Sequence, residues 1–206
     1  MGGLDFWLLQ SINGWPNSLI WFLKFFSVAL TLLWVKIVLG IVIVAMLAAN
    51  AKTRTAILLT LIAVGIGNTM TNIAKSAFPM HRPFQDYPFA TVKDDGSINP
   101  ILHGFHVLMR VGTSPSMGTA SAHSANMAAV AFAMCYFFGW RGTPWIAVAL
   151  LTGISRVYVG AHYPVQVLFG WLVGLFASFV VIKTWEALIR ARTGVQSEED
   201  ETPELA

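Results

Sequence analysis

Residues 155–166 read SRVYVGAHYPVQ and join two apolar stretches, residues 144–160 and 164–188. A bilayer span needs about 20 mainly apolar residues, and both stretches approach or exceed that length. Pro164 suits the first turn of a helix, so it predicts where the second helix begins. The turn therefore places an arginine, a histidine and a glutamine between two membrane helices, where polar side chains are costly and usually functional.

Apolar stretches of this kind recur along the chain and predict an all-α integral membrane bundle. Of the 206 residues, 56% are hydrophobic and only 11% are charged, whereas soluble domains have about 25% charged residues. The predicted spans are residues 17–34, 35–50, 55–78, 120–140, 144–160 and 164–188. The first two are separated only by Trp34-Val35-Lys36, so five spans is the alternative to six. These lengths predict a single membrane-embedded domain, residues 1–192.

Three segments outside the spans have distinct predicted roles. Residues 1–16 contain a short amphipathic helix, residues 4–12, that we expect to lie in the membrane interface, with Trp7 and Trp15 at headgroup level. Residues 79–118 form one long connection, and a connection of this length in a compact protein is usually functional. Residues 193–206 are acidic and polar, which predicts a disordered tail.

The charge distribution predicts an orientation in the membrane. Six spans place both termini on one side, together with Lys52, Arg54, Arg141, Lys183, Arg190 and Arg192. With Lys75, Arg82 and Arg156 set aside as functional residues, the positive-inside rule makes that side cytoplasmic. The long connection then lies on the extracytoplasmic side of the plasma membrane. The net charge of +3 comes from scattered basic residues rather than from a basic stripe, so no nucleic-acid partner is expected.

Residues 68–82 place polar groups along the third predicted span and at its end. Asn68, Asn72 and Lys75 have helical spacing, which predicts a polar stripe that faces the bundle interior. Arg82 follows the span. The alternative is that Lys75 extends to the interface and that Arg82 is an ordinary flanking charge.

Two further segments carry histidines close to small or cationic residues. Residues 120–126, ASAHSAN, predict a helix start whose free backbone N–H groups could bind an anion, with His123 beside them. Arg156 and His162 flank the turn before the last span. Each segment alone also fits a capping serine, an interfacial histidine or a snorkelling arginine. Together, on one predicted membrane face, they favour a phosphoryl-binding site with cationic donors, a nucleophile and an acid.

The order and spacing of these residues resemble the type 2 phosphatidic acid phosphatase superfamily. Its three motifs are Lys-x6-Arg-Pro, Pro-Ser-Gly-His and Ser-Arg-x5-His-x3-Asp. This chain has KSAFPMHRP at 75–83, ASAH at 120–123 and SRVYVGAHYPVQ at 155–166. The resemblance covers about residues 55 to 175, and the early INGWPNSL stretch looks like members that act on polyprenyl diphosphates.

The resemblance implies a six-span bundle and a metal-independent phosphatase, without a cofactor, that works through a phosphohistidine. His162 would be the nucleophile, and His123 would protonate the leaving oxygen. The phosphate oxygens would be held by Lys75, Arg82, Ser121, Arg156 and the backbone N–H groups near Ala122 and His123.

The chain departs from the motifs at three positions. Ala120 and Ala122 replace a proline and a glycine, and alanine still presents a backbone N–H group. Gln166 replaces the aspartate that would fix the histidine tautomer and favour its positive charge. In serine proteases the equivalent amide costs on the order of 10⁴ in rate. A glutamine oxygen can still accept a hydrogen bond, and glutamine here resembles the glucose-6-phosphatase and dolichyl-diphosphate phosphatase branches.

We therefore expect Gln166 to orient His162, and expect Gln166→Asp to keep or raise activity. A slow enzyme, or one that uses Asp94 or Asp95 instead, is the alternative.

Several other polar residues have less specific patterns. His103 and His106 have a spacing that two metal ligands could use, but a loop role is more typical because no cluster of further ligands accompanies them. His81 could contact a headgroup or simply lie in the interface. The acidic residues of the long connection are expected to be solvated; these are Asp86, Asp94 and Asp95.

The resemblance favours hydrolysis of a polyprenyl diphosphate carrier lipid to its monophosphate. Phosphatidic acid, phosphatidylglycerol phosphate and a lipid A phosphate are alternative substrates. The expected partners are thus a lipid phosphate or diphosphate and the bilayer itself. A membrane transporter is the alternative from another class, and it would be expected to show inverted repeats, which are not recognisable in the sequence.

Overall fold

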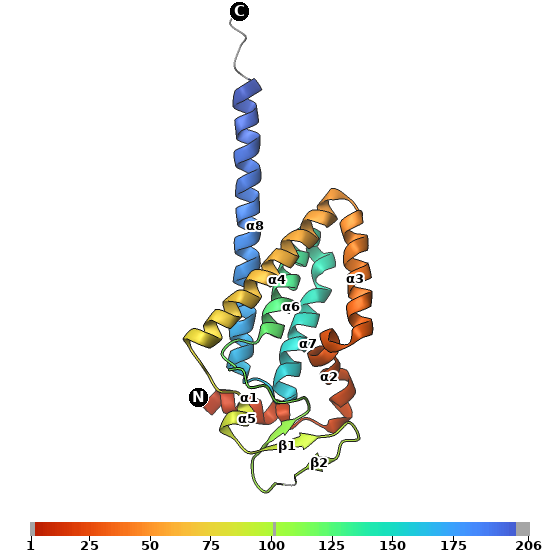
Figure 1. The fold of residues 1–206 in the computed structure, drawn as a ribbon, viewed down its shortest axis with the longest axis vertical. Helices are drawn as coiled ribbons and strands as arrows, with labels where there is room; N and C mark the ends of the chain where they lie inside the picture. The colour runs from red at the N-terminus through yellow and green to blue at the C-terminus, as the bar shows by residue number, and fades with distance from the viewer. Residues whose placement is uncertain (1–2, 101, 201–206) are drawn as a thin grey trace, which may run out of the picture.

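The computed structural model describes residues 3–100 and 102–200. Figure 1 shows a bundle of helices with a small sheet at one end. The helices are α1 (Gly3–Asn13), α2 (Ile20–Val28), α3 (Leu33–Ala48), α4 (Ala51–Ala77), α5 (Pro83–Asp86), α6 (Ala122–Phe138), α7 (Pro144–Tyr158) and α8 (Pro164–Asp200), with 3-10 turns η1 (Asn17–Leu19), η2 (Ala29–Thr31) and η3 (Gly139–Gly142). The strands are β1 (Phe89–Val92), β2 (Ile98–Asn99) and β3 (Val107–Met109).

Two helices among the described residues are long and apolar enough to cross a membrane. They are α4 and the Pro164–Thr193 part of α8. The pair α2 and α3 passes the same test only jointly, and the pair is bent by 52°. The nine residues of α2 give about 14 Å of helix, well short of the hydrocarbon thickness of about 30 Å. The helical membrane architecture is therefore supported, whereas separate spans at residues 17–34 and 35–50, and hence six spans, are not.

This bend also changes the predicted topology. Leu32, between α2 and α3, has extended backbone angles of −76° and 125°, and α3 continues in the general direction of α2 (Figure 1). No glycine or proline lies between residues 17 and 39 to reverse the chain. The prediction that both termini lie on the same side is wrong: α1 lies at the sheet end of the bundle, and α8 ends at the opposite end (Figure 1).

The centre of the bundle is α6, which contacts α4, α7 and α8. Small residues let α6 and α8 approach closely, as is common between membrane helices. A Cβ added to Gly170 would lie 2.4 Å from the carbonyl oxygen of Ser121, and one added to Gly174 would lie 2.0 Å from that of Ala125. This close packing fixes the start of α6 against the start of α8.

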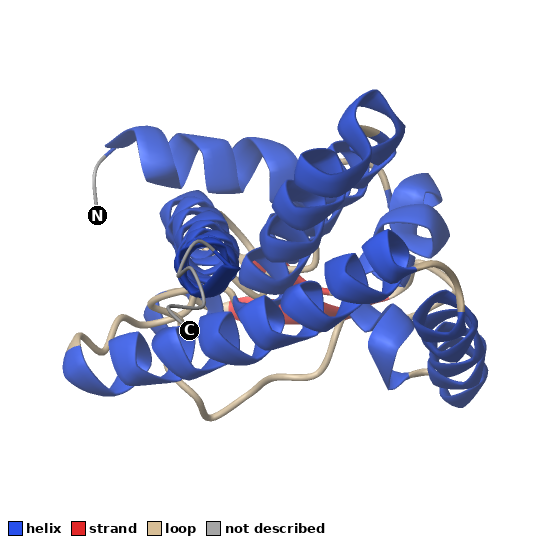
Figure 2. Ribbon diagram, turned by 90° about the horizontal axis from the view of Figure 1, so that it is seen from above, coloured by secondary structure: helices blue, strands red, loops and turns tan. Residues whose placement is uncertain are grey.

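The connection between α4 and α6 folds into structure of its own. Its sheet has the order β2-β1-β3, with β1 antiparallel to β2 and parallel to β3. Seen from above, the strands lie beneath the middle of the helices (Figure 2). The buried side chains of Ala90, Val92, Val107 and Met109 turn one face of the sheet inward. The connection is thus packed against the bundle end where the polar segments meet.

Helix α1 is attached to this same end. The Asp5 carboxylate accepts a hydrogen bond from the backbone N–H of Val165 at 2.9 Å, which satisfies a free donor in the first turn of α8. Leu9 is buried against Tyr163 and Val157. The predicted helix at residues 4–12 is therefore present.

The first residues of the tail that was predicted to be disordered are helical in the structure. Residues 193–200 continue α8 as far as Asp200, and glutamine and glutamate in this stretch are favourable helix residues. The remainder of the predicted tail, residues 201–206, lies outside the described residues.

Candidate active site

The last turn of α7 and the turn after it hold Arg156 and His162 in a fixed relation. The backbone N–H groups of Ala161 and His162 both donate to the Arg156 carbonyl, at 3.1 and 3.2 Å. Gly160 has a φ of +77°, and a Cβ there would lie 2.8 Å from the Leu108 carbonyl oxygen, so the turn requires glycine. The His162 side chain is buried as a result, with 3% of its residue surface exposed.

Arg82 reaches this turn from the connection after α4. Its Nη1 donates to the Ala161 carbonyl at 3.3 Å and lies 3.4 Å from Nε2 of His162. Its Nε and Nη2 donate to the carbonyl and the hydroxyl of Ser116 at 2.7 and 2.9 Å. Burial lowers the pKa of Arg82 from its usual value, but arginine remains charged at neutral pH. Arg82 therefore belongs to a hydrogen-bonded cluster with Ser116, Ala161 and His162 and is not an ordinary flanking charge.

The hydrogen bonds of Gln166 determine which nitrogen of His162 carries the proton. The Gln166 Oε1 accepts from the backbone N–H of Tyr163 at 3.2 Å, and Nε2 donates to the carbonyl of His81 at 2.7 Å. Because a backbone N–H only donates and a carbonyl only accepts, the amide has one orientation. Nδ1 of His162 therefore donates to Oε1 at 3.1 Å, with the Gly118 carbonyl as a second acceptor at 3.2 Å. The lone pair of the imidazole is left on Nε2.

The same surroundings keep this imidazole neutral. Burial is the largest cause that holds the pKa of His162 well below its usual 6.5, and the positive charges of Arg156 and Arg82 act in the same direction. The hydrogen bond to Gln166 opposes them. A neutral histidine with its lone pair on Nε2 is the form that can act as a nucleophile at neutral pH.

Gln166 has two contacts that an aspartate could not reproduce together. Its oxygen orients His162 as expected, but its NH₂ group also donates to the His81 carbonyl. A carboxylate would present an acceptor to that carbonyl, and aspartate is shorter by one methylene. From this geometry we expect Gln166→Asp to lower activity, contrary to the expectation from the sequence, because the His81 carbonyl loses its donor.

Two residues of the cluster were missed by sequence reasoning. Ser116 binds the Arg82 guanidinium through its carbonyl and hydroxyl, although Pro115-Ser116 stands apart from the histidine motif. Gly118 accepts from His162, and a Cβ on it would lie 2.6 Å from Oε1 of Gln166 and 2.9 Å from Cγ of Arg82. Glycine at position 118 is thus required by the close approach of two site residues.

Arg156 differs from Arg110, another buried arginine, because one of its guanidinium N–H donors has no hydrogen-bond partner among the described residues. Its residue surface is only 8% exposed, and its Nε is buried without a hydrogen-bond partner in the described part of the chain. Arg110 is 1% exposed, but its guanidinium donates to the carbonyls of Asn13, Tyr158 and Trp15 and to the Asn17 side chain. An unpaired buried cation is costly unless an anion binds to it.

Lys75 and His123 complete the charged surroundings. Lys75, in the last turn of α4, is half-buried and within electrostatic reach of Arg82 and Arg156. The His123 ring feels the charges of the same three cations. Across residues 3–100 and 102–200, no Asp or Glu lies within 4.0 Å of the nitrogens of Lys75, Arg82 or Arg156. The cluster is therefore a concentrated positive site that favours an anion.

The start of α6 provides the predicted helix terminus. Ser121 is its N-cap, and the Ser121 Oγ accepts from the backbone N–H and the hydroxyl of Ser124 at 3.3 and 2.9 Å. Ala122 and His123 follow as the first helical residues, where backbone N–H groups have no partner within the helix. The Ser121 oxygen is thus occupied in capping, and the N–H groups at 122 and 123 are the better-placed donors for an anion.

Several predicted polar residues lie outside the cluster or have other partners. Asn72 is exposed, so the expected inward stripe on α4 includes only the half-buried Asn68 and Lys75. Asp86 is not simply solvated, because it accepts from the Tyr163 hydroxyl at 2.8 Å and pairs with His81 at 2.9 Å.

The remaining acidic and histidine candidates also have local partners. Asp94 pairs with Lys24 at 2.6 Å, and the Asp95 side chain accepts from the backbone N–H of Ser97 at 2.8 Å. The His106 ring contacts the Gly104 carbonyl, and the described residues contain no group of three or more potential metal-ligating side chains around it or His103.

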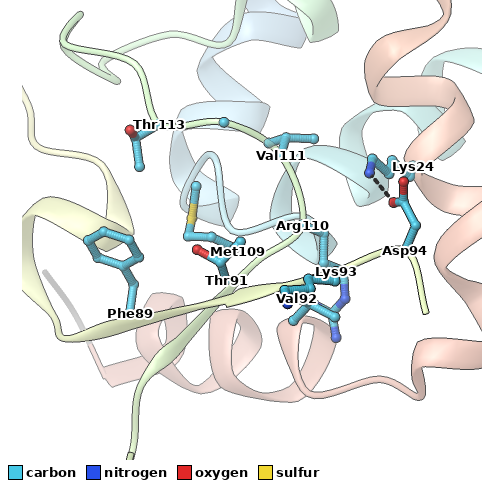
Figure 3. A pocket seen from close by; sticks show the side chains of 11 residues that line it. Lys24, Phe89, Thr91, Val92, Lys93, Asp94, Met109, Arg110, Val111 and Thr113 are labelled. Carbon is cyan, nitrogen blue, oxygen red and sulfur yellow. Dashed lines mark hydrogen bonds and ion pairs between the residues drawn. The ribbon is translucent and has the colours of Figure 1, made fainter. Parts of the chain in front are cut away.

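A cavity of about 570 Å³ lies beside β1 and the segment after β3 (Figure 3). Its wall carries the Lys24–Asp94 pair together with Lys93 and Arg110. The His162 cluster does not contribute to this wall among the described residues. The cavity is therefore separate from the candidate active site.

Comparison with known proteins places the chain in a family. Residues 55–190, more than half of the chain, match the model of the PAP2 superfamily. The chain belongs to this superfamily, which confirms the resemblance carried by the three motifs.

Individual relatives are more distant. The chain is 30% identical over 107 residues to undecaprenyl-diphosphatase BcrC of Bacillus subtilis, which covers 45% of this chain and 54% of the relative. It is 27% identical over 146 residues to the bacitracin transport permease protein BcrC of Bacillus licheniformis, and this match covers 71% of this chain and 63% of the relative. Both relatives are thus matched over less than two thirds of their length. The crystal structure of Aquifex aeolicus LpxE matches with a TM-score of 0.65 at 18% identity, over 88% of this chain and 96% of that one, so the fold is shared.

Proposed function

We propose that this protein is a membrane lipid phosphatase that hydrolyses a polyprenyl diphosphate through a phosphohistidine at His162, without a metal ion. The observation that carries the proposal is the placement of His162, whose Nδ1 donates to Gln166 and whose Nε2 lies beside Arg82, within electrostatic reach of Arg156, whose buried Nε has no hydrogen-bond partner among the described residues. A phosphate group would supply the negative charge that this cluster lacks. Phosphoryl transfer depends mainly on such preplaced donors, because charge spreads over the phosphate oxygens in the transition state.

The reaction divides into two transfers. Nε2 of His162 attacks the terminal phosphorus and forms an N–P bond, while the P–O bond to the leaving lipid monophosphate breaks and His123 donates a proton to that oxygen. Water then attacks the phosphorus and forms a new P–O bond while the N–P bond breaks and its electron pair returns to Nε2 of His162; His123 accepts a proton from the water, and inorganic phosphate leaves. During both steps Gln166 and the Gly118 carbonyl hold the Nδ1 proton, and Arg82 and Arg156 bind the phosphate oxygens.

The polyprenyl diphosphate substrate is supported by the name of one relative, the undecaprenyl-diphosphatase BcrC of Bacillus subtilis. The site also suits a membrane-anchored substrate, because it lies at one end of a bundle whose outer surface is apolar. Phosphatidic acid, phosphatidylglycerol phosphate and a lipid A phosphate present the same terminal phosphate and are the alternatives within this class.

A transporter is the second candidate, since one relative is described as a transport permease. Against it, the buried cations of the cluster, Arg82 and Arg156, lie together at one end of the bundle instead of following a path through it. The purified protein with a polyprenyl diphosphate and excess chelator distinguishes the two, because only a phosphatase releases inorganic phosphate. We expect release in chelator, and loss of activity in chelator would contradict metal independence.

The nucleophile is tested in the same assay. His162→Ala should lower the rate by on the order of 10³-fold or more, whereas His103→Ala, a change at an exposed histidine, should leave it unchanged. Equal rates for His162→Ala and wild type would refute the assigned nucleophile.

We also propose that the site faces the extracytoplasmic side of the plasma membrane. The basic residues near the opposite end of the bundle include Lys52, Arg54 and Arg141. At the site end, Lys75, Arg82 and Arg156 belong to the cluster, Arg110 binds backbone carbonyls and Lys24 has a carboxylate partner, so among these basic residues Lys93 alone is exposed without such a role. The positive-inside rule then makes the opposite end cytoplasmic. With Cys135 replaced by alanine, Asp95→Cys should react with an impermeant maleimide on intact cells and Lys52→Cys should not. The reverse labelling pattern would overturn this orientation.

A further inference from the structure

The carboxylate of Asp86 connects two residues whose backbone groups fix Gln166. Its Oδ2 accepts from the Tyr163 hydroxyl at 2.8 Å, and its Oδ1 lies 2.9 Å from Nδ1 of His81. The backbone N–H of Tyr163 donates to Gln166 Oε1, and the backbone carbonyl of His81 accepts from Gln166 Nε2. One carboxylate therefore holds the side chains of both residues that determine the orientation of the Gln166 amide.

That orientation decides the protonation of His162. With Oε1 toward His162, the imidazole must present an N–H at Nδ1, and Nε2 keeps its lone pair. If the amide turned by 180°, its NH₂ group would face Nδ1 and favour the opposite tautomer, in which Nε2 carries the proton and cannot attack. A glutamine amide can turn in this way, whereas an aspartate carboxylate has two equivalent oxygens. In this chain, further contacts are therefore needed to hold the Gln166 amide in one orientation.

The Tyr163 hydroxyl is suited to this task. Tyr163 is 1% exposed, and burial, followed by its hydrogen bond to Asp86, raises the pKa of Tyr163 above its usual value. The phenol therefore stays protonated and donates to Asp86. The side chain of His81 is largely exposed, so Asp86 is the contact that holds it in place.

We infer that Asp86 is a positioning residue, which locks the Gln166 amide through Tyr163 and His81 and so keeps the attacking nitrogen of His162 unprotonated. The inference rests on the proposed function for its kinetic consequence, but not for its structural one. Among residues 3–100 and 102–200, Asp86 makes no hydrogen bond or ion pair to His162, Lys75, Arg82 or Arg156, so its effect is expected on the chemical step and not on substrate binding.

The test compares Asp86→Ala with Asp94→Ala. Both remove a carboxylate from the same connection, but Asp94 is an exposed partner of Lys24 away from the cluster. Asp86→Ala should lower kcat about tenfold or more, with KM changed less than about twofold, because the nucleophile is misplaced while the phosphate donors remain. Asp94→Ala should leave both constants unchanged.

A spectroscopic readout separates positioning from a general loss of structure. Protein labelled with ¹⁵N-histidine, with the His162 signals assigned from their loss in His162→Asn, should show the Nδ1–H tautomer in wild type and Asp94→Ala. In Asp86→Ala the Nε2–H form should become populated. An unchanged tautomer, or kinetic constants equal to those of Asp94→Ala, would overturn the inference.

Tyr163→Phe provides a milder second variant, which removes one hydroxyl and keeps the ring in its buried place. It should shift the tautomer in the same direction by a smaller amount, and it decides the question if Asp86→Ala does not fold. The tautomer is measured without substrate. Failure of the positioning inference can therefore be told from failure of the proposed function, which is tested by phosphate release.

Discussion

Gly118→Ala provides a sharp test of how closely the site is packed. The added Cβ would lie 2.6 Å from Gln166 Oε1, 2.7 Å from its Nε2 and 2.9 Å from Cγ of Arg82. Moving from 2.6 Å to the 3.4 Å of an ordinary contact requires a shift of about 0.8 Å in the amide. Because Gln166 orients His162 and Arg82 binds beside it, the nucleophile and a phosphate donor should be displaced together.

A displacement of about 1 Å can cost on the order of 10² in rate, so we expect kcat/KM to fall between about 10- and 100-fold. Overpacking should also destabilise the fold by about 1–3 kcal/mol. The assay is release of inorganic phosphate from a polyprenyl diphosphate in detergent micelles, with thermal unfolding of the same preparations. Gly112→Ala is the matched control, since it lies in the same connection and its Cβ would meet nothing within 4 Å. If Gly118→Ala retained kcat/KM within about twofold of Gly112→Ala, the proposed packing of Gln166 against Gly118 would be wrong.

Three further predictions concern charge and hydrogen bonding in the cluster. Arg156→Met should abolish phosphate release yet raise Tm, because it removes a buried cation whose Nε has no partner among the described residues. Arg110→Met should instead lower Tm, because it leaves several buried carbonyls without donors. Equal shifts in Tm for the two variants would contradict this distinction between the two arginines. On the acidic side of the pH profile, the fall in kcat/KM caused by protonation of His162 should occur below pH 6.5, because the lowered pKa of His162 keeps the attacking imidazole neutral down to a lower pH. A His162-dependent fall centred at or above pH 6.5 would be inconsistent with this. Gln166→Asp should lower kcat, since the His81 carbonyl loses its donor, and wild-type kcat in this variant would favour the simpler orienting role expected from the sequence.

The sequence was sufficient to identify the segments that meet at the site, because each carries a charged or polar group at a predicted membrane boundary. Arg82, Arg156 and His162 could be selected in this way, and the structure brings them together. The role of the glutamine could be predicted only in part. Its second partner is the backbone carbonyl of His81, and a sequence does not show where a backbone carbonyl points.

Other features depend on tertiary packing that local sequence does not encode. Arg110 and Arg156 are both single arginines next to apolar residues. Only the fold shows that Arg110 donates to several carbonyls, whereas the buried Nε of Arg156 has no hydrogen-bond partner within the described ranges. The need for glycine at position 118 arises from side chains 36 and 48 residues away along the chain, Arg82 and Gln166. The bend at Leu32 was missed because an apolar run predicts a span without specifying whether it is straight.

The most direct measurement of the central claim is to trap the covalent intermediate. The protein is mixed with a polyprenyl diphosphate labelled with ³²P in the terminal phosphate, quenched in alkali within a turnover, digested and mapped by mass spectrometry. We expect alkali-stable, acid-labile label on the peptide that contains His162, and no label in His162→Ala. Turnover without label on that peptide, or label on His123 instead, would contradict it.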